Sequence, residues 1–317
     1  MSDVRVPLLV QQRVAQLGPA GAAWLAGLDG LVADLERRWS IRVGAPLSGG
    51  SASYVARART ADDRDVVLKL APPDPDLHTA GQVRTLAAAQ GAGYAVLLAH
   101  DVERGALLLE ALGPPMSRLG LPVERQLPLL AGLLTRAWQV PRADDAPEPD
   151  QAQVLAGLVG RLWEELDRPC PERVVAVALR CADRRGAATG PDRRVVVHGD
   201  PHPDNALQVL APRAGAPSGF VLVDPDGFVA DPAYDLGVVL RGWCDELLAV
   251  DPVAAPVLAR GWCRVLAAHT GLPEAAVWEW GLLERVSSGL YLMRLGAQEE
   301  GRRHLRSAEL LTTSDSP

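Results

Sequence analysis

The most specific segment of the chain reads Val195-Val196-Val197-His198-Gly199-Asp200-Pro201-His202-Pro203-Asp204-Asn205. Its valines predict a buried strand, and the glycine and prolines after them predict a loop. The loop contains Asp200 and, five residues later, Asn205. Phosphoryl transfer needs a carboxylate that accepts the proton of the attacking hydroxyl, and an oxygen ligand that holds magnesium. We therefore expect Asp200 to act as the base and Asn205 to bind the metal.

The next buried strand along the chain ends at a second acidic position. Phe220-Val221-Leu222-Val223 predicts this strand, and Asp224 follows it, nineteen residues after Asn205. A carboxylate at a strand end suits a second magnesium ligand, because the metal there offsets charge that develops on phosphate oxygens. We expect Asp224 in this role and regard Asp226 as the weaker candidate for it.

The histidines of the loop admit two interpretations. His198 and His202 are four residues apart, a spacing that suits zinc when it falls on a helix. Pro201 and Pro203 disfavour a helix at this point, so the zinc interpretation is the weaker one. We expect both histidines to support the loop, with His198 bonded to its backbone. A chance cluster of aspartates in a turn-rich loop is the remaining alternative, and the strand-end aspartate that follows argues against it.

A third acidic segment, Asp231-Pro232-Ala233-Tyr234-Asp235-Leu236, predicts the start of a helix. Asp231 suits the N-cap, and a proline is favoured in the first turn that follows. Asp235 lies on that first turn, where its carboxylate can accept hydrogen bonds from the backbone of the Asp200 loop. We expect both aspartates to support the site and not to take part in the chemistry.

Lys69 is the single lysine among 32 basic residues, and it lies near the end of the apolar run 65–70. A compact ammonium suits phosphate oxygens in a cleft where the flat guanidinium fork does not fit. Upstream, the segment Ser48-Gly49-Gly50-Ser51 separates two predicted strands, and its backbone N–H groups can approach an anion. The alternative explanation for a lone lysine is a bias in base composition. The alternative for a Gly-Gly-Ser turn is an ordinary hairpin without a function. The functional interpretation rests on the two features occurring together.

Composition narrows the class of protein. The 317 residues are 48% apolar and 22% charged, which is typical of a soluble globule of two domains or one large one. The net charge of −7 argues against a nucleic-acid partner and is compatible with a cationic small molecule. The four cysteines lack C-x-x-C or metal-type spacing, and we see no secretory signal or membrane-spanning stretch. We expect a cytoplasmic protein, monomeric or weakly dimeric, without a membrane partner.

The order of predicted elements divides the chain into a mixed part and a helical part. A helical segment occupies residues 1–40, and a break at 112–115 separates the two parts. The first part continues with predicted strands at 41–43, 54–59 and 65–70, a helix at 74–89, and strands at 95–99 and 106–110. The second part contains predicted helices at 123–139, 150–166, 171–182 and 233–311, with strands at 206–210 and 220–223.

These motifs together resemble the aminoglycoside phosphotransferase family of the kinase-like superfamily. The resembling segments are Ser48–Ser51, Val67–Lys69, Gly105–Glu110, His198–Asn205, Val223–Pro225 and Asp231–Leu236. Finer features, in Val223–Pro225, Arg241–Leu247 and Glu284–Tyr291, resemble the subgroup of aminoglycoside 6-phosphotransferases (streptomycin kinases) and hydroxyurea phosphotransferases. The resemblance covers nearly the whole chain.

The resemblance implies an α+β, two-lobed protein-kinase-like fold. Residues 1–111 would form a small antiparallel-sheet N-lobe with one main helix, and residues 112–317 a larger, mostly helical C-lobe. ATP, with GTP as the open alternative, and Mg²⁺ would be the cofactors. Lys69 would hold the α- and β-phosphates beneath the loop 48–51. Adenine would bond the backbone near Glu110 and Leu112, and His202 stands where protein kinases carry a loop lysine.

One position departs from the kinase pattern. Kinases orient the phosphate lysine with a glutamate from the helix of the small lobe, and this chain carries Gln82 at the aligned position. Glutamine can accept a hydrogen bond from Lys69 but supplies no charge. Three explanations are open. The alignment is displaced at this position, or Asp74 or Asp76 orients Lys69 instead, or catalysis is weakened.

The expected substrate is a small hydroxylated molecule, most simply a cationic aminoglycoside of the streptomycin type, in resistance or self-protection. Asp245, Glu246 and Glu284 are candidates for neutralising its charge, although a solvated helix face is the simpler explanation for each of them. Hydroxyurea, a sugar or another metabolite is the second possibility for the substrate. A kinase-shaped binding protein without catalysis is the third possibility, and Gln82 is the one feature that favours it.

Overall fold

The computed structural model describes residues 6–47, 53–74, 77–188, 190 and 193–312. The chain folds into two compact units. Unit 1 contains residues 1–113 and 208–226, and unit 2 contains residues 114–207 and 227–317. No helix in the described ranges is both long enough and apolar enough to cross a bilayer.

Unit 1 is built around an antiparallel sheet with strand order β1-β2-β3-β5-β4. Lys69 on β3 pairs with Val55 of β2 and with Leu107 of β5, so the lysine lies on the central strand. The elements of this part of the chain are α1 (Leu8–Gln16), α2 (Gly18–Trp39), β1 (Ile41–Pro46), β2 (Tyr54–Thr60), β3 (Asp65–Leu70), α3 (Thr79–Ala89), β4 (Leu97–Asp101) and β5 (Ala106–Glu110).

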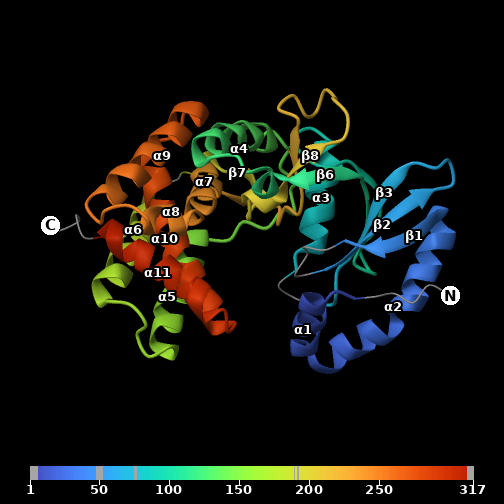
Figure 1. Ribbon diagram of the computed structural model, residues 1–317, viewed down its shortest axis with the longest axis horizontal. Helices are drawn as coiled ribbons and strands as arrows, with labels where there is room; N and C mark the ends of the chain where they lie inside the picture. The colour runs from blue at the N-terminus through green and yellow to red at the C-terminus, as the bar shows by residue number, and fades with distance from the viewer. Residues whose placement is uncertain (1–5, 48–52, 75–76, 189, 191–192, 313–317) are drawn as a thin grey trace. The chain divides into compact units, whose positions relative to one another are not determined.

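Helix α2 lies along the sheet of unit 1 (Figure 1). Its apolar residues Leu28, Val32 and Leu35 recur at helical spacing and are buried. They pack against a cluster that includes Tyr54 and Leu68 from the strands. The described part of the predicted helical segment 1–40 therefore forms two helices, of which α2 covers the sheet carrying Lys69.

The segment 208–226 packs with unit 1, whereas the predicted division at residues 111 and 112 leaves it in the second part. The N–H of Leu222 donates to the carbonyl of Gly93 at 2.8 Å, and the N–H of Ala95 donates to the carbonyl of Leu222 at 2.9 Å. Arg213 donates to the carbonyl of Tyr94 at 2.9 Å and to Glu110 Oε1 at 2.6 Å. These bonds place Asp224 in unit 1. The assignment of 1–111 and 112–317 as domains stays a prediction.

A second sheet has the order β6-β8-β9, and the chain passes from one unit to the other within β6, within β8 and again after Asp226, beyond β9. Its strands are β6 (Leu112–Pro115), β8 (Ala206–Val209) and β9 (Phe220–Leu222). Strand β9 corresponds to the predicted strand before Asp224. Asp224 therefore lies just beyond the C-terminal end of β9.

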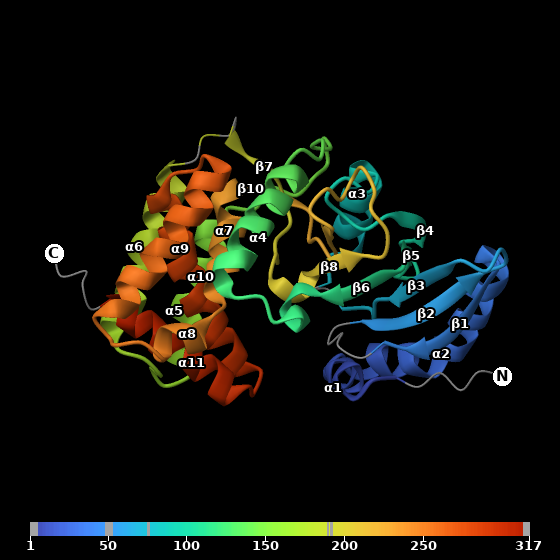
Figure 2. The same ribbon diagram turned by 45° about the horizontal axis from the view of Figure 1, so that its top comes forward.

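Unit 2 is largely helical, and α10 lies among its other helices (Figure 2). Residues on every side of α10 are buried, including Glu279, Glu284 and Arg285. The elements are η1 (Met116–Leu119), α4 (Val123–Ala137), α5 (Gln151–Glu165), α6 (Glu172–Ala188), β7 (Val195–Val197), η3 (Pro203–Asn205), β10 (Phe228–Ala230), α7 (Pro232–Arg241), α8 (Cys244–Leu248), α9 (Ala254–Thr270), α10 (Glu274–Arg294) and α11 (Gln298–Thr312).

These observations confirm the predicted α+β class, with an antiparallel-sheet N-lobe and a helical C-lobe. The prediction for the helix at 74–89 was wrong at its start, because α3 begins at Thr79. Asp74 instead accepts a hydrogen bond from Arg13 Nε of α1 at 2.7 Å. An acidic residue after two prolines is typical of a helix start, but here its partner lies on a different helix.

Candidate active site

Asp235 fastens the loop that carries Asp200 to helix α7. Its Oδ2 accepts from the N–H of His198 at 2.9 Å, and its Oδ1 accepts from the N–H of Gly199 at 2.9 Å. Trp138 Nε1 also donates to Oδ2, at 2.8 Å. Asp231 caps the same helix by accepting from the N–H of Ala233 at 3.0 Å. These are the supporting bonds that the sequence led us to expect, and they hold the loop at the end of β7.

Replacing Asp235 by asparagine is expected to lower the free energy of unfolding by about 2–4 kcal/mol, because an amide NH₂ would face backbone N–H donors in a buried site. Urea denaturation measures this loss. Asp245→Asn is the matched control, because the Asp245 side chain is 72% exposed and its loss should be within about 0.5 kcal/mol. Equal effects of the two substitutions would contradict the fastening role.

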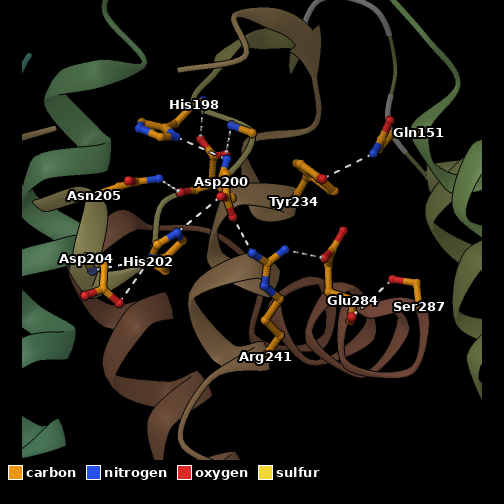
Figure 3. Close-up of polar contacts among 12 residues, drawn as sticks. Gln151, His198, Asp200, His202, Asp204, Asn205, Tyr234, Arg241, Glu284 and Ser287 are labelled. Atoms are coloured by element: carbon orange, nitrogen blue, oxygen red, sulfur yellow. Dashed lines mark hydrogen bonds and ion pairs between the residues drawn. The ribbon is translucent and has the colours of Figure 1, made fainter. Parts of the chain in front are cut away.

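The carboxylate of Asp200 lies between two cationic groups (Figure 3). Arg241 Nη2 pairs with its Oδ1, and His202 Nε2 lies 3.2 Å from its Oδ2. Burial alone would raise the pKa of this carboxyl, but the charge of Arg241 and the hydrogen bond of His202 hold it well below its usual range. Burial opposes the charge of His202, yet bonds to Asp200 and Asp204 raise the pKa of the imidazole to about 9. Asp200 is therefore an ionised acceptor at neutral pH.

Hydrogen bonds within the loop fix its backbone around Asp200. Asn205 Nδ2 donates to the carbonyl of Asp200 at 2.9 Å. The N–H of Asp200 donates to His198 Nδ1 at 3.1 Å, and His198 is fully buried. The amide group of Asn205 is thereby oriented by its nitrogen, and its side-chain oxygen is the ligand type that magnesium binds.

Arg241 is itself held by a second carboxylate. Its Nη1 donates to Glu284 Oε2 at 3.1 Å, and Glu284 also accepts a hydrogen bond from the Tyr234 hydroxyl. Gln151 Nε2 donates to the Tyr234 oxygen at 3.2 Å. The Glu284 side chain is 3% exposed, so direct contact with a substrate would require this arrangement to open. Burial raises the pKa of Glu284, and the charge of Arg241 opposes that rise.

Unit 1 holds the other group of predicted site residues. Lys69 Nζ lies 2.8 Å from Asp224 Oδ1, and the lysine side chain is 11% exposed. Gln82 Nε2, from α3, donates to the same oxygen at 3.3 Å. The glutamine thus lies beside the lysine's partner, on the helix where the sequence placed it, and contacts the aspartate. Asp224 adopts a left-handed backbone conformation with φ of 58°, which is uncommon for a residue other than glycine.

The remaining predicted residues are spread over both units. Glu110 ends β5 and its Oε1 accepts from the N–H of Val96 at 2.9 Å, while Leu112 begins β6. Asp245 and Glu246 are exposed on α8. The residues 48–51 of the predicted phosphate loop lie outside the described residues, as does Asp76. Within the described ranges, no group of three or more His, Cys, Asp or Glu side chains is placed to hold a metal ion.

A family model described as "Phosphotransferase enzyme family" matches residues 43–278, which contain Lys69, Asp200, Asn205, Asp224 and Arg241. The chain belongs to this family. It is therefore an enzyme of the phosphotransferase class, and the curated relatives described next are small-molecule phosphotransferases.

Two curated relatives of this phosphotransferase have different substrates in their names. Streptomycin 6-kinase of Streptomyces glaucescens is 30% identical over 280 residues, which cover 84% of each chain. Hydroxyurea phosphotransferase of Kitasatospora aureofaciens is 32% identical over 251 residues, covering 74% of this chain and 67% of the relative. The relatives support the predicted subgroup and do not distinguish between its substrates.

Solved structures show the same fold for the phosphotransferase. The choline kinase LicA from Streptococcus pneumoniae superposes with a TM-score of 0.61 at 13% identity, covering 90% of this chain and 98% of that one. At this identity the likeness concerns the fold alone. The fold class predicted from the sequence is confirmed by this similarity as well as by the elements of the two units.

Sequence reasoning about this phosphotransferase did not assign a role to Arg241. The sequence did contain a signal for Arg241, because this residue ends an apolar helix and begins one of the segments that resemble the subgroup. What the sequence could not supply was the partner, because Asp200 lies 41 residues away and Glu284 lies 43 residues away.

Proposed function

We propose that the protein is an ATP- and magnesium-dependent O-phosphotransferase whose acceptor is a streptomycin-type aminoglycoside, acting in antibiotic resistance or self-protection. The observation that carries the reaction type is the Asp200 carboxylate, which Arg241 and His202 keep ionised on a loop fastened by Asp235. The similarity to streptomycin 6-kinase over 84% of the chain supports the choice of acceptor.

In this proposal Asp200 orients the acceptor hydroxyl and accepts its proton while the hydroxyl oxygen bonds to the γ-phosphorus. The bond between that phosphorus and the β–γ bridging oxygen breaks in the same step, and ADP leaves. A carboxylate with a lowered pKa is a weak base, but phosphoryl transfer depends on positioning and charge stabilisation more than on base strength. Lys69 would exchange its carboxylate partner for the α- and β-phosphate oxygens. Residues 48–51 would cover those phosphates, with adenine near Glu110 and Leu112.

The donor groups fit the proposed metal. Asn205 supplies an amide oxygen, and Asp224 supplies a carboxylate that is 42% exposed at the end of β9. Magnesium prefers oxygen ligands and usually takes one or two from the protein, with phosphates and water completing its shell. When bound, it would neutralise charge on the transferring phosphoryl group. Asn205 and Asp224 would hold it.

A second acceptor, hydroxyurea, is favoured by the relative that is named for it at 32% identity. Streptomycin carries positive charge and hydroxyurea does not. Exposed carboxylates of unit 2 would therefore favour streptomycin over hydroxyurea as the acceptor. Asp245 and Glu246 on α8 are the predicted contacts for a cationic acceptor. A metabolite other than these two remains within the same reaction class.

Incubation of the protein with Mg-ATP and a panel of acceptors tests the proposal. Streptomycin, other aminoglycosides, hydroxyurea and simple sugars are compared, and products are read by mass. We expect a mass increase of one phosphoryl group on streptomycin, and loss of the product when EDTA removes the metal. Phosphorylation of hydroxyurea alone would contradict streptomycin as the acceptor and identify hydroxyurea in its place. Nucleotide binding without any product would contradict the aminoglycoside, and no nucleotide binding would contradict the kinase reaction.

A further inference from the structure

Helices α7 and α10 approach each other at a glycine. A Cβ atom at Gly237 would lie 2.5 Å from Cβ of Trp280 and 2.9 Å from the backbone nitrogen of Gly281. Distances this short exclude any side chain at residue 237 unless the helices move. Arg241 lies one turn beyond Gly237 on α7, and Glu284 lies one turn beyond Trp280 on α10. The close contact therefore brings Arg241 and Glu284 within reach of each other.

Glu284 holds the side chain of Arg241 in the interior of unit 2. Its Oε2 accepts from Arg241 Nη1 at 3.1 Å (Figure 3). It also accepts a hydrogen bond from the Tyr234 hydroxyl. The backbone carbonyl of Glu284 accepts from Ser287 Oγ at 3.1 Å, so the turn of α10 at this point is also bonded. The guanidinium therefore has an anionic partner on each side, Asp200 and Glu284.

Arg285, the next residue on α10, holds the backbone on both sides of Arg241. Its Nη2 donates to the carbonyls of Leu240 and Gly242, the second at 3.0 Å. Its Nη1 donates to Ser307 Oγ at 2.9 Å, so α11 orients the guanidinium as well. Arg285 is 2% exposed, and each of these partners is neutral. A buried arginine with neutral partners is costly, which points to a role that a smaller residue would not fill.

We propose that Glu284 and Arg285 are positioning residues for phosphoryl transfer, which fix Arg241 by its side chain and its backbone and thereby aim the carboxylate of Asp200. The proposal rests on the proposed function in one respect, the role of Asp200. It assigns Glu284 a place behind the site, in contrast to the substrate contact expected from the sequence.

The charges around Arg241 explain why a second carboxylate is needed. The groups that face it are Asp200, Glu284, the Tyr234 hydroxyl and His202. The Arg285 cation of α10 lies nearby, bonded to the carbonyls of Leu240 and Gly242. With Asp200 as its sole anionic partner, the guanidinium would move toward that carboxylate and turn it away from the acceptor. Glu284 balances this attraction from the opposite side, so Asp200 keeps its orientation while it remains ionised.

Glu284→Gln is the deciding variant, because glutamine keeps the volume, accepts from Arg241 and donates to Tyr234 while removing the charge. Glu279→Gln is the matched control on the same helix. Glu279 is also buried and pairs with two arginines, with Arg185 Nε 2.6 Å from its Oε2 and Arg184 on its Oε1. In the described part of the chain, neither of these arginines bonds to Asp200 or Arg241. Both variants are compared for kcat, for KM of the acceptor and of ATP, and for Tm.

We expect Glu284→Gln to lower kcat by about 10- to 100-fold, because small misplacements of reacting groups cost factors of this size. Both KM values should stay within about twofold, since neither residue is expected to bind a substrate in the ground state. Glu279→Gln should leave kcat within the same twofold. Equal kcat losses in both variants, or no loss in Glu284→Gln, would overturn the proposal. A change confined to KM of the acceptor would overturn the proposal and support the original prediction that Glu284 contacts the substrate.

A double-mutant cycle with Arg241→Met shows whether Glu284 acts through the arginine. In that background Glu284→Gln should change kcat by less than about twofold, because the residue that it positions is gone. A full loss in both backgrounds would refute the route through Arg241. Arg285→Lys keeps the charge but not the paired bonds to two carbonyls, and it should lower kcat and Tm together. An unchanged kcat in Arg285→Lys would show that Arg285 is not a positioning residue.

A measurement without turnover separates this proposal from the proposed function. The ¹⁵Nε–¹H NMR signal of Arg241, assigned with Arg241→Lys, reports the mobility of its guanidinium. We expect Glu284→Gln to increase that mobility and Glu279→Gln to leave it unchanged. An unchanged signal in Glu284→Gln would overturn the positioning role. An inactive wild-type protein with the expected NMR change would contradict the proposed acceptor and leave the hold on Arg241 established.

Discussion

Asp200→Asn is expected to lower kcat by about 10²- to 10⁴-fold, the range typical of losing a general base. Asparagine keeps the shape of the side chain and can still accept from Arg241, but it cannot take up a proton at neutral pH. The loop should remain in place, because Asp235 holds the N–H groups of His198 and Gly199 independently of residue 200. The measurement is steady-state transfer to the acceptor found by the panel.

Nucleotide affinity and Tm separate a chemical effect of this substitution from a structural one. Nucleotide affinity should be close to that of the wild type. Tm should fall only modestly, because asparagine creates no cavity and Glu284 still pairs with Arg241 when the charge of Asp200 is removed. Asp204→Asn on the same loop is the control, because its side chain is 64% exposed, and its kcat should fall far less. A near-normal kcat in Asp200→Asn would refute the assignment of the base.

Lys69→Met is expected to weaken nucleotide binding by about 10- to 100-fold, and to lower kcat as well. A charge-assisted hydrogen bond contributes about 1.5–3 kcal/mol, and each 1.4 kcal/mol is a factor of ten in affinity. Methionine retains the apolar stem on β3 and leaves Asp224 without its ammonium partner. Isothermal titration with Mg-ATP measures the loss of affinity, and single-turnover transfer measures the loss in rate.

Lys69→Arg is the informative companion variant. It keeps the charge but places a wider, planar group where the lysine side chain is 11% exposed and lies on the central strand of the sheet. We expect it to recover little of the lost affinity, in line with the use of lysine at this one position of an arginine-rich chain. An unchanged affinity in Lys69→Met would refute the phosphate role, and full recovery with arginine would show that charge alone is sufficient.

The parts of the site that the sequence predicted are those in which local chemistry is decisive. A strand, a proline-rich loop and a helix start with an N-cap aspartate are visible as short patterns, and Asp231 and Asp235 lie where those patterns place them. The strand that carries Lys69 follows from the short apolar run 65–70. Gln82 was located on its helix by the family pattern, although its amide contacts Asp224.

The parts that the sequence did not predict depend on contacts between distant segments. Arg213 joins the hairpin before Asp224 to Tyr94 and Glu110 over more than a hundred residues, so a contiguous division of the chain could not anticipate it. Glu284 was expected to contact the substrate or to lie on a solvated face, yet α10 is surrounded by other helices and the residue is buried. Burial of a charged residue becomes predictable only when its partner is known, and here the partner is on another helix.

The contact between Gly237 and Trp280 has a consequence for how this sequence can vary during evolution. Residue 237 carries no functional group, yet a methyl group there would push apart the two helices that bring Arg241 and Glu284 together. Natural selection on such an enzyme would therefore remove substitutions at a position with no chemistry of its own. New acceptor specificities would arise at exposed positions such as Asp245 and Glu246 of α8, which can change without disturbing this contact.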